Sequence, residues 1–405
     1  MRARQSNSLT CKDDLASRCD APRAPGWGAV ARTLMLVALA APAWADDEHR
    51  QTLRARDHRV SLRVLGEPRT VPTRSGTRLT YELVLGNESN EAIQPESVDV
   101  FDGDTHRLLA RYRGADLQER LGGPDGQTVA DGRMEQGQQA MLYLDLVTED
   151  VPAELTHRIL YRDTSGSGQT QVVEGSASVR AKGVPALHPP LVSGPWVAIY
   201  DSRWPRGHRR AGYVRGGAFR IPGRFAIDWV RLDGQGRKTP YGSDTVARAY
   251  SYGQPVFAVA DGTVVSVRSM APERHNLSDP APSREGNEIT IKLEDGSFAH
   301  YGHLRPGSAR VAVGDVVRAR EPIAEVGFSG SASDPQLHFA LTDGPVELAS
   351  EGVPYVLSHY RLLGNYSSAI DAGAKPWNAH GEPTELQGYM PSAGDVVSFD
   401  PPAGL

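Results

Sequence analysis

Short segments in which apolar and polar residues alternate run through this sequence, and they constrain its fold more than any other feature. Between Arg59 and about Arg180 they include TRLTYELVLGN and QQAMLYLDLV, separated by turn-forming runs such as GNESNE and GGPDGQ. Alternation with a period of two is typical of half-buried β-strands, and about seven short strands over such a length favour an antiparallel sandwich. The sequence therefore predicts an all-β chain in which residues 46–180 form an immunoglobulin-like β-sandwich.

A second β-rich region follows a Pro-rich linker at residues 181–195, AKGVPALHPPLVSGP. It contains the segments QPVFAVADGTVVSVRS, NEITIKLEDGSFAHYGHL and PIAEVGFSG, which end in Asp-Gly or Gly turns. We expect a second antiparallel β domain at residues 196–345 and no amphipathic helix. Residues 346–405 show no clear period and are predicted to be an irregular C-terminal extension.

The N-terminal residues 1–45 have the parts of a leader and signal peptide. Arg32 precedes an apolar run from Leu34 to Ala41, and a small-x-small pattern ends at Ala45. This run is shorter than a bilayer-spanning helix needs. The pattern predicts cleavage after Ala45, export to the periplasm or cell envelope, and no membrane span in the mature chain. Residues before about Gly28 either precede a later start codon or form a polar leader.

Cysteine content narrows the possible chemistry. Both cysteines, Cys11 and Cys19, precede the predicted cleavage point. The mature chain would then have no disulfide, no catalytic thiol and no cysteine-ligated zinc. The formal net charge is −5, and without a basic patch we expect no nucleic-acid partner.

Three segments carry residue types that suit a metal site: GRFAIDWV with Asp228, FAHYGHL with His303, and PQLHFAL with His338. A bare carboxylate within an apolar strand is costly, so we interpret Asp228 as a ligand. Side chains two residues apart on a strand share a face, so Gln336 should lie beside His338. Imidazole and carboxylate groups are typical zinc ligands.

These segments resemble the motifs of the lysostaphin/LytM-type zinc metallopeptidases, which cut peptide cross-links in bacterial peptidoglycan. The family pattern is His-x-x-x-Asp, a GxPVxAxADGxV hairpin, YxHL, and GxSGxSxxPHLHFE. Here YGQPVFAVADGTVV, YGHL and GDVVRAREPIAEVGFSGSASDPQLHF match it within about Trp196 to Thr342. The resemblance implies a compact antiparallel sheet with a groove on one face, Zn2+ as the cofactor and peptidoglycan peptides as partners.

The resemblance also assigns roles. Asp228 and His338 match two zinc ligands, and His303 matches one of two catalytic histidines. Arg224 stands where the family has its first ligand histidine, and Gln336 stands where it has the other catalytic histidine. Arginine offers no lone pair, so Arg224 is either a salt-bridge partner or a binder of an anionic substrate group. Gln336 can donate a hydrogen bond to an oxyanion but cannot shuttle a proton.

Two ligands alone would bind zinc weakly, because a catalytic zinc takes three protein ligands, and a third could come from elsewhere in the chain. His208, upstream of the first motif, is our candidate. The alternative is that His208 is a solvated member of a basic cluster with its arginine neighbours. His300 is another candidate, but its odd separation from His303 would send the two to opposite faces of a regular strand.

Three functions remain open. The first is a secreted zinc metalloendopeptidase acting on peptidoglycan cross-link peptides, with His303 and Gln336 as catalytic residues. The second is a catalytically degenerate LytM-like domain that binds peptidoglycan or regulates another cell-wall hydrolase. The third is a structural envelope protein. Retention of Asp228 and His338 favours the enzyme, since a chain that only binds has no need of zinc ligands.

Overall fold

The computed structural model describes residues 60–123, 129–164, 168–179, 183–201, 204 and 207–402. The chain divides into two compact units, Met1–Ala43 and Trp44–Leu405, and all described residues belong to the second. The predicted leader and signal peptide at residues 1–45 lie outside the described residues, as do both cysteines. None of the helices among the described residues has the length and hydropathy needed to cross a membrane.

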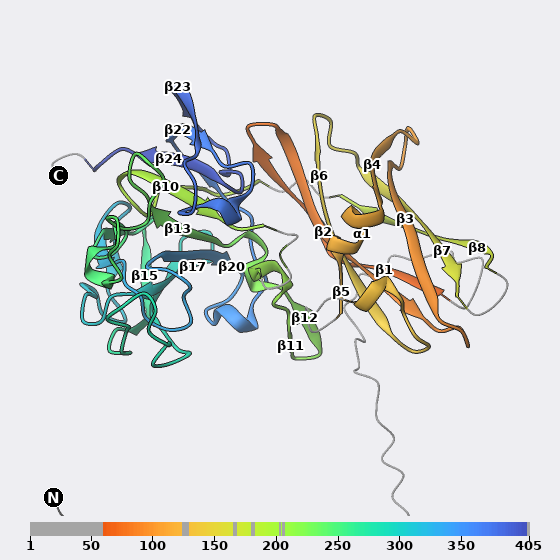
Figure 1. The fold of residues 1–405 in the computed structure, drawn as a ribbon, viewed down its shortest axis with the longest axis horizontal. Coiled ribbons are helices and arrows are strands. Elements are labelled where there is room, and N and C mark those ends of the chain that lie inside the picture. Colours follow the sequence, from red (N-terminus) through yellow and green to blue (C-terminus); the bar gives the residue numbers. More distant parts are fainter. Residues whose placement is uncertain are drawn as a thin grey trace, which may run out of the picture. The chain divides into compact units, whose positions relative to one another are not determined.

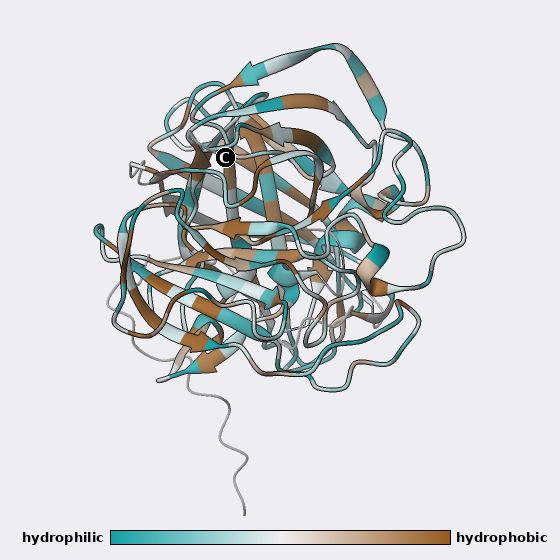
Figure 2. Cartoon of the chain, turned by 90° about the vertical axis from the view of Figure 1, so that its left-hand side faces the viewer, coloured by the Kyte–Doolittle hydropathy of each residue, from teal (hydrophilic) through white to brown (hydrophobic). Residues whose placement is uncertain are grey.

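Strands dominate the described residues, as predicted, and Figure 1 shows the single short α-helix among them, α1 (Gly114–Arg120). In Figure 2 apolar and polar residues form alternating bands along many strands. The 3-10 segments are η1 (Ala130–Gly132), η2 (His208–Arg210), η3 (Pro222–Phe225), η4 (Val246–Arg248), η5 (Glu347–Ala349) and η6 (Ala369–Asp371). Two of these, η2 and η5, contribute side chains to the candidate site.

The N-terminal part consists of two four-stranded antiparallel sheets. Their strands are β1 (Val60–Thr73), β2 (Gly76–Asn87), β3 (Ile93–Asp102), β4 (Leu108–Arg113), β5 (Leu121–Gly122), β6 (Gln139–Thr148), β7 (Glu154–Asp163) and β8 (Thr170–Ser178). The orders are β1-β2-β6-β5 and β4-β3-β7-β8. Alternate side chains from both sheets, such as Leu83 of β2 and Val100 of β3, form one buried cluster. The two sheets therefore enclose a common core; the immunoglobulin type of this sandwich stays a prediction.

The C-terminal part is built on a ten-stranded sheet with the order β18-β15-β16-β17-β20-β13-β10-β24-β22-β23. Its strands are β10 (Ser193–Ile199), β13 (Ile227–Arg231), β15 (Gly262–Arg268), β16 (Asn287–Leu293), β17 (Phe298–Leu304), β18 (Val316–Val317), β20 (Leu337–Thr342), β22 (Tyr360–Asn365), β23 (Asn378–Leu386) and β24 (Asp395–Phe399). Trp229, Tyr301 and Phe339 of the central strands belong to the main core on one face. The polar residues that alternate with them occupy the opposite face.

Smaller strand pairs flank this sheet. They are β11 (Tyr213–Arg215) with β12 (Ala218–Arg220), β14 (Pro255–Phe257) with β19 (Pro322–Glu325), and β9 (Ala186–Leu187) with β21 (Val356–Leu357). The last pair is parallel and joins the Pro-rich segment to the C-terminal region. Residues 183–195 of the predicted linker therefore contribute strand residues to the C-terminal part.

The prediction that residues 346–405 form an irregular extension is wrong, because this segment contains strands of the main sheet. Strands β22 and β24 extend the main sheet, with β24 pairing β10, and β23 forms its outer edge. The sequence pattern concealed them for two reasons. The register shifts between Leu362 and Gly364, and β23 is mostly exposed and has few apolar residues to show a period. The other predicted domain boundaries remain predictions.

Candidate metal centre

Asp228 and His338 lie directly opposite each other on neighbouring strands. The register of β13 and β20 pairs them, and side chains of paired residues point to the same face of a sheet. Ile227 and Trp229 on either side of Asp228 belong to the main core. Strand alternation therefore directs the Asp228 carboxylate and the His338 imidazole to the polar face, as the sequence predicts.

His208 completes a compact group with these two residues. Its Nε2 lies 2.8 Å from Oδ2 of Asp228, and Nδ1 of His338 lies 2.8 Å from Oδ1 of the same carboxylate. One ligand atom from each of the three residues can be chosen so that all lie within 4.8 Å of one another. The structure thus brings together the three side chains that the sequence analysis put forward as zinc ligands.

This donor set fits zinc. Two imidazole nitrogens and one carboxylate oxygen form a known ligand set of catalytic zinc, with ligand distances of about 2.0–2.2 Å. Burial favours the neutral form of Asp228, but His208 and His338 outweigh it and lower the pKa of the carboxyl. The carboxylate is therefore ionised and able to bind a cation. Among the described residues this is the one group of three or more His, Cys, Asp or Glu with such spacing.

Glu347 holds the other side of the His338 ring. Its Oε1 lies 2.9 Å from Nε2 of His338. Burial raises the pKa of Glu347, but His338 outweighs this and the value falls to about 2. Metal-binding histidines commonly donate their second N–H to a carboxylate, which fixes the ring. The sequence analysis missed Glu347 because nothing distinguishes it from the neighbouring acids Asp343 and Glu351.

One ring nitrogen of His303, Nδ1, forms a hydrogen bond within the protein, which leaves Nε2 for other interactions. Nδ1 lies 2.9 Å from the carbonyl oxygen of Ser329, and the ring centroid lies 5.9 Å from that of His338. A carbonyl only accepts hydrogen bonds, so Nδ1 carries the proton and Nε2 keeps a lone pair. Burial, followed by the charge of His338, lowers the pKa of His303 to about 4. His303 is therefore neutral near pH 7, and its Nε2 lone pair is the atom that can accept a hydrogen bond or a proton.

The prediction that His300 and His303 point to opposite faces is wrong. His300 pairs with Ala340, and Gly302 pairs with His338, so His300 shares the polar face. His303 has a φ of 61°, which breaks the regular alternation and turns its ring back toward His338. His300 nevertheless stays outside the metal group, because its two ring nitrogens contact hydroxyls of Thr290 and Thr342 at 3.1 and 2.7 Å.

Gln336 and Gly302 flank His338. Gln336 is buried just before β20, and its backbone forms a bridge with Gly327. Its role at an oxyanion stays a prediction. Gly302 lies so close to His338 that a Cβ at this position would be 3.2 Å from the Cβ of His338. Glycine therefore leaves the room that the His338 side chain occupies.

Arg224, which stands where the resembled family pattern has its first ligand histidine, belongs to a buried ionic cluster. Its Nη2 lies 2.7 Å from Oε2 of Glu82, and its Nη1 contacts Glu351. Its side chain is 5% exposed, too little to reach a substrate. Of the two interpretations open from the sequence, the structure supports the salt-bridge partner.

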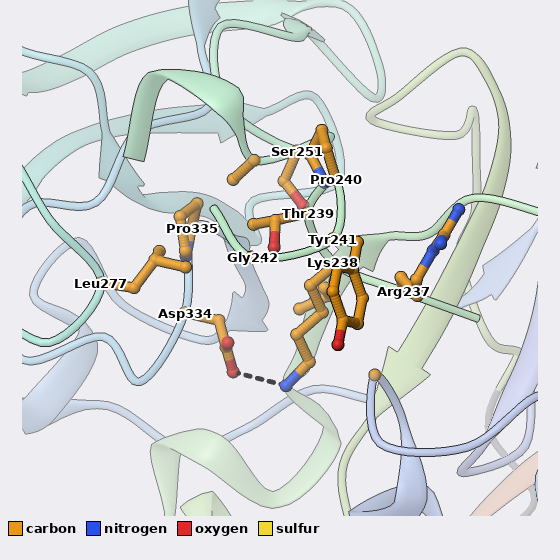
Figure 3. A pocket seen from close by; sticks show the side chains of 13 residues that line it. Arg237, Lys238, Thr239, Pro240, Tyr241, Gly242, Ser251, Leu277, Asp334 and Pro335 are labelled. Atoms are coloured by element: carbon orange, nitrogen blue, oxygen red, sulfur yellow. Dashed lines mark hydrogen bonds and ion pairs between the residues drawn. The ribbon is translucent and has the colours of Figure 1, made fainter. Parts of the chain in front are cut away.

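A pocket with a cavity volume of about 320 Å³ is lined mainly by loop residues, whose side chains Figure 3 shows. Val230, two residues beyond Asp228 on β13, lines it, as does Pro335 just before Gln336. Lys238 and Asp334 form an ion pair of 2.9 Å at its wall, drawn as a dashed line in Figure 3. The pocket therefore adjoins the strand segments that carry the candidate site.

Residues 241–348 match the model of peptidase family M23. This range contains His303, Gln336, His338 and Glu347 but begins after His208 and Asp228. No curated protein matches the chain.

Several solved structures are similar to parts of the chain. The catalytic domain of the antimicrobial peptidase lysostaphin from Staphylococcus simulans is 23% identical; the match covers 29% of this chain and 83% of that one, with a TM-score of 0.20. A catalytic domain of the prophage-encoded M23 protein EnpA from Enterococcus faecalis is 23% identical, over 41% and 92%, with a TM-score of 0.25. A zinc containing peptidase from Vibrio cholerae is 14% identical, over 72% and 83%, with a TM-score of 0.26.

Proposed function

We propose that the chain, whose residues 241–348 match the model of peptidase family M23, is an exported zinc metalloendopeptidase that hydrolyses peptidoglycan cross-link peptides. The observation that carries the proposal is the convergence of His208, Asp228 and His338 within 4.8 Å on the polar face of the sheet. These residues would hold the zinc. When bound, zinc supplies Lewis-acid chemistry that polarises a scissile carbonyl and increases the acidity of water.

The protein's own residues prepare the site for that chemistry. The Asp228 carboxylate faces both imidazoles, and Glu347 fixes the ring of His338 from the other side. With its neutral ring and free Nε2 lone pair, His303 takes up the proton released by the attacking water and later delivers it to the leaving amine. Gln336 donates a hydrogen bond from its amide to the oxygen on which negative charge develops.

The neighbouring pocket is our candidate for holding the substrate peptide. Its wall combines the ion pair of Lys238 with Asp334, the highly exposed ring of Tyr241 and the apolar side chains of Leu277 and Pro240. A peptide offers amides, charged groups and short apolar side chains, and such a mixed wall suits all three. The signal-peptide pattern that ends at Ala45 supports a place in the periplasm or cell envelope, where peptidoglycan lies.

Zinc content of the purified chain of residues 46–405 tests the metal site, with His208→Ala and His338→Ala alongside. His380→Ala, on the outer strand β23, is the control. We expect about one zinc per chain in the parent and the control, and none in the two site variants. Zinc lost only from His338→Ala would remove His208 from the ligand set. If the parent held no zinc even after loading, the proposal that the chain is a zinc metallopeptidase would be refuted.

Digestion of cross-linked peptidoglycan tests the reaction. The zinc-loaded parent should release peptide fragments, and His303→Ala should bind zinc but release none. Gln336, which occupies the place of a catalytic histidine in the family pattern, favours one alternative: a domain that binds peptidoglycan or regulates another hydrolase. Zinc binding and sedimentation with peptidoglycan, without release of fragments, would establish that alternative instead.

A further inference from the structure

We propose that the N-terminal β-sandwich supports the metal centre, with Arg209 and Glu82 as positioning residues that hold His208 toward Asp228. The inference rests on the proposed zinc site and adds the support of its third ligand. His208 does not lie on the main sheet that carries Asp228 and His338. It begins the three-residue segment η2, which by itself makes only one turn of hydrogen-bonded backbone.

Arg209, the residue after His208, inserts its side chain among strands of the sandwich. Its Nε lies 2.8 Å from Oε1 of Glu82, and its Nη2 lies 2.8 Å from the carbonyl oxygen of Tyr81 and 2.6 Å from that of Leu144. Only 4% of the Arg209 side chain is exposed, and the Glu82 side chain is fully buried. A planar guanidinium can satisfy such divergent acceptors at once, so these contacts fix both the position and the rotation of the segment.

Arg210 anchors the same segment a second time. Its Nη1 lies 3.1 Å from the carbonyl oxygen of Leu121, and its guanidinium carbon lies 4.1 Å from the ring centroid of Tyr143. Successive side chains of a 3-10 segment point about a third of a turn apart. Because both arginine side chains point into the sandwich, the side chain of His208 points in the third direction. There its Nε2 lies 2.8 Å from Oδ2 of Asp228.

The Glu82 carboxylate also holds the segment that packs behind His208. Arg224 of η3 donates to Glu82 from Nε and Nη2, at 3.1 and 2.7 Å from Oε2. Gly223 comes just before it, and a Cβ on Gly223 would lie 2.6 Å from the Cβ of His208. One buried carboxylate of the sandwich therefore ties together η2, which carries the ligand, and η3, which confines it.

This arrangement explains how the three candidate ligands can come together although position 224 is not a histidine. The ligand comes from a separate segment, and the arginine at position 224 strengthens the anchor of that segment. Zinc affinity should then depend on Glu82, which precedes Arg209 by 127 residues in the sequence.

The test compares Arg209→Met with Arg111→Met in the chain of residues 46–405. Arg111 is the matched control because it forms a two-point ion pair with Asp99, at 2.6 and 2.7 Å, on the other sheet of the sandwich. We would measure the zinc dissociation constant by competition with a chelator and the melting temperature of the metal-free chain. The imidazole 15N shifts of His208 would report its hydrogen bond to Asp228.

We expect Arg209→Met to weaken zinc binding about 10- to 100-fold, as loss of groups that orient ligands does. Arg111→Met should keep the affinity of the parent, although both variants lower the melting temperature. An Arg209→Met chain with a lowered melting temperature and the affinity of the parent would overturn the proposal, because Arg209 would then be only structural. Should Arg209→Met fail to fold, Arg209→Lys replaces it. Lysine keeps the charge beside Glu82 but lacks the fork, so an unchanged affinity there also overturns the proposal.

The two proposals can fail separately. A parent chain that binds no zinc refutes the proposed function, and the 15N shifts then decide the present inference without metal. His208 shifts that change in Arg209→Met and stay constant in Arg111→Met would uphold the positioning role. Shifts that stay constant in both variants would refute it.

Discussion

Two buried histidines, one in each part of the molecule, have opposite electrostatic surroundings. In the sandwich, Nε2 of His157 lies 2.8 Å from the hydroxyl of Tyr81, and its Nδ1 lies 3.2 Å from the carbonyl oxygen of Gly175. In the main sheet, His338 lies between the carboxylates of Asp228 and Glu347. Burial lowers the pKa of His157 to about 4. Burial acts in the same direction on His338, but Glu347 and Asp228 outweigh it and raise its pKa well above the usual value.

The difference shows that burial alone does not distinguish a structural histidine from a functional one. His157 has neutral partners and stays uncharged, as packing requires. His338 faces two carboxylates, whose negative charges favour a cation at the ring or beside it. A buried imidazole between two acids is therefore the feature that marks the polar face of the main sheet as a cation site.

The largest effect should come from Asp228→Ala, which removes the carboxylate that His208 and His338 share. We expect zinc binding and peptidoglycan digestion to fall below detection, since two imidazoles alone hold zinc weakly. Tyr81→Phe, which removes the neutral partner of His157, should leave one zinc per chain. Elemental analysis and a digestion assay check both. If Asp228→Ala retained zinc, the carboxylate beside His338 would not be what distinguishes this histidine from His157 as part of a cation site.

Gln336→His sharpens the comparison by adding an imidazole beside His338. A histidine there can transfer a proton, so we expect digestion by the zinc-loaded chain to rise by about 10²-fold or more. The rate of fragment release measures this. Gln336→Met, similar in size but unable to donate a hydrogen bond, should be slower than the parent. A rate in Gln336→His no greater than that of the parent would deny position 336 a catalytic role.

His157 should make the metal-free chain less stable in acid. Its folded pKa lies below the unfolded value, so its contribution is present above the unfolded pKa of about 6.5 and is lost as pH falls toward 4. Between pH 7 and pH 4 the free energy of unfolding should fall by about 3 kcal/mol more in the parent than in His157→Gln. Denaturant titrations at both pH values measure the difference. Equal losses would show that His157 is not held neutral.

The smallest of these effects should follow Glu347→Gln. The amide can still accept a hydrogen bond from His338 but brings no charge, so we expect zinc affinity to fall by about tenfold. Chelator competition measures it, and Glu294→Gln on an exposed turn is the control. Unchanged affinity in Glu347→Gln would show that its charge does not act on the metal site.

Local patterns in the sequence were sufficient for the parts of the site that lie on regular strands. The alternation of β13 and β20 places Asp228 and His338 on one face, and the Asp-Gly and Gly turns mark the ends of many strands. The resemblance to the family motifs predicts His303, whose ring the structure places 5.9 Å from that of His338. These features depend on neighbours within a few residues, which a single sequence displays directly.

The remaining features depend on contacts that are distant in the sequence or on irregular backbone. The position of His208 depends on Glu82 and Arg209, and no local pattern links these residues. The orientation of His303 depends on one left-handed residue within a strand. The place of Glu347 depends on how the segment after β20 folds back on His338. Alternation describes none of these, because it assumes a regular strand.

The place of β24 in the main sheet has a consequence for the order in which the protein is made. Strand β10 pairs with β13, which carries Asp228, on one side and with β24 on the other. A ribosome synthesises β24 long after it has completed His338, and folding of a domain follows synthesis. The sheet that supports the candidate site is therefore completed only after residues 395–399 have been made. A nascent chain in which every site residue has already been synthesised still lacks β24, the strand that pairs with β10.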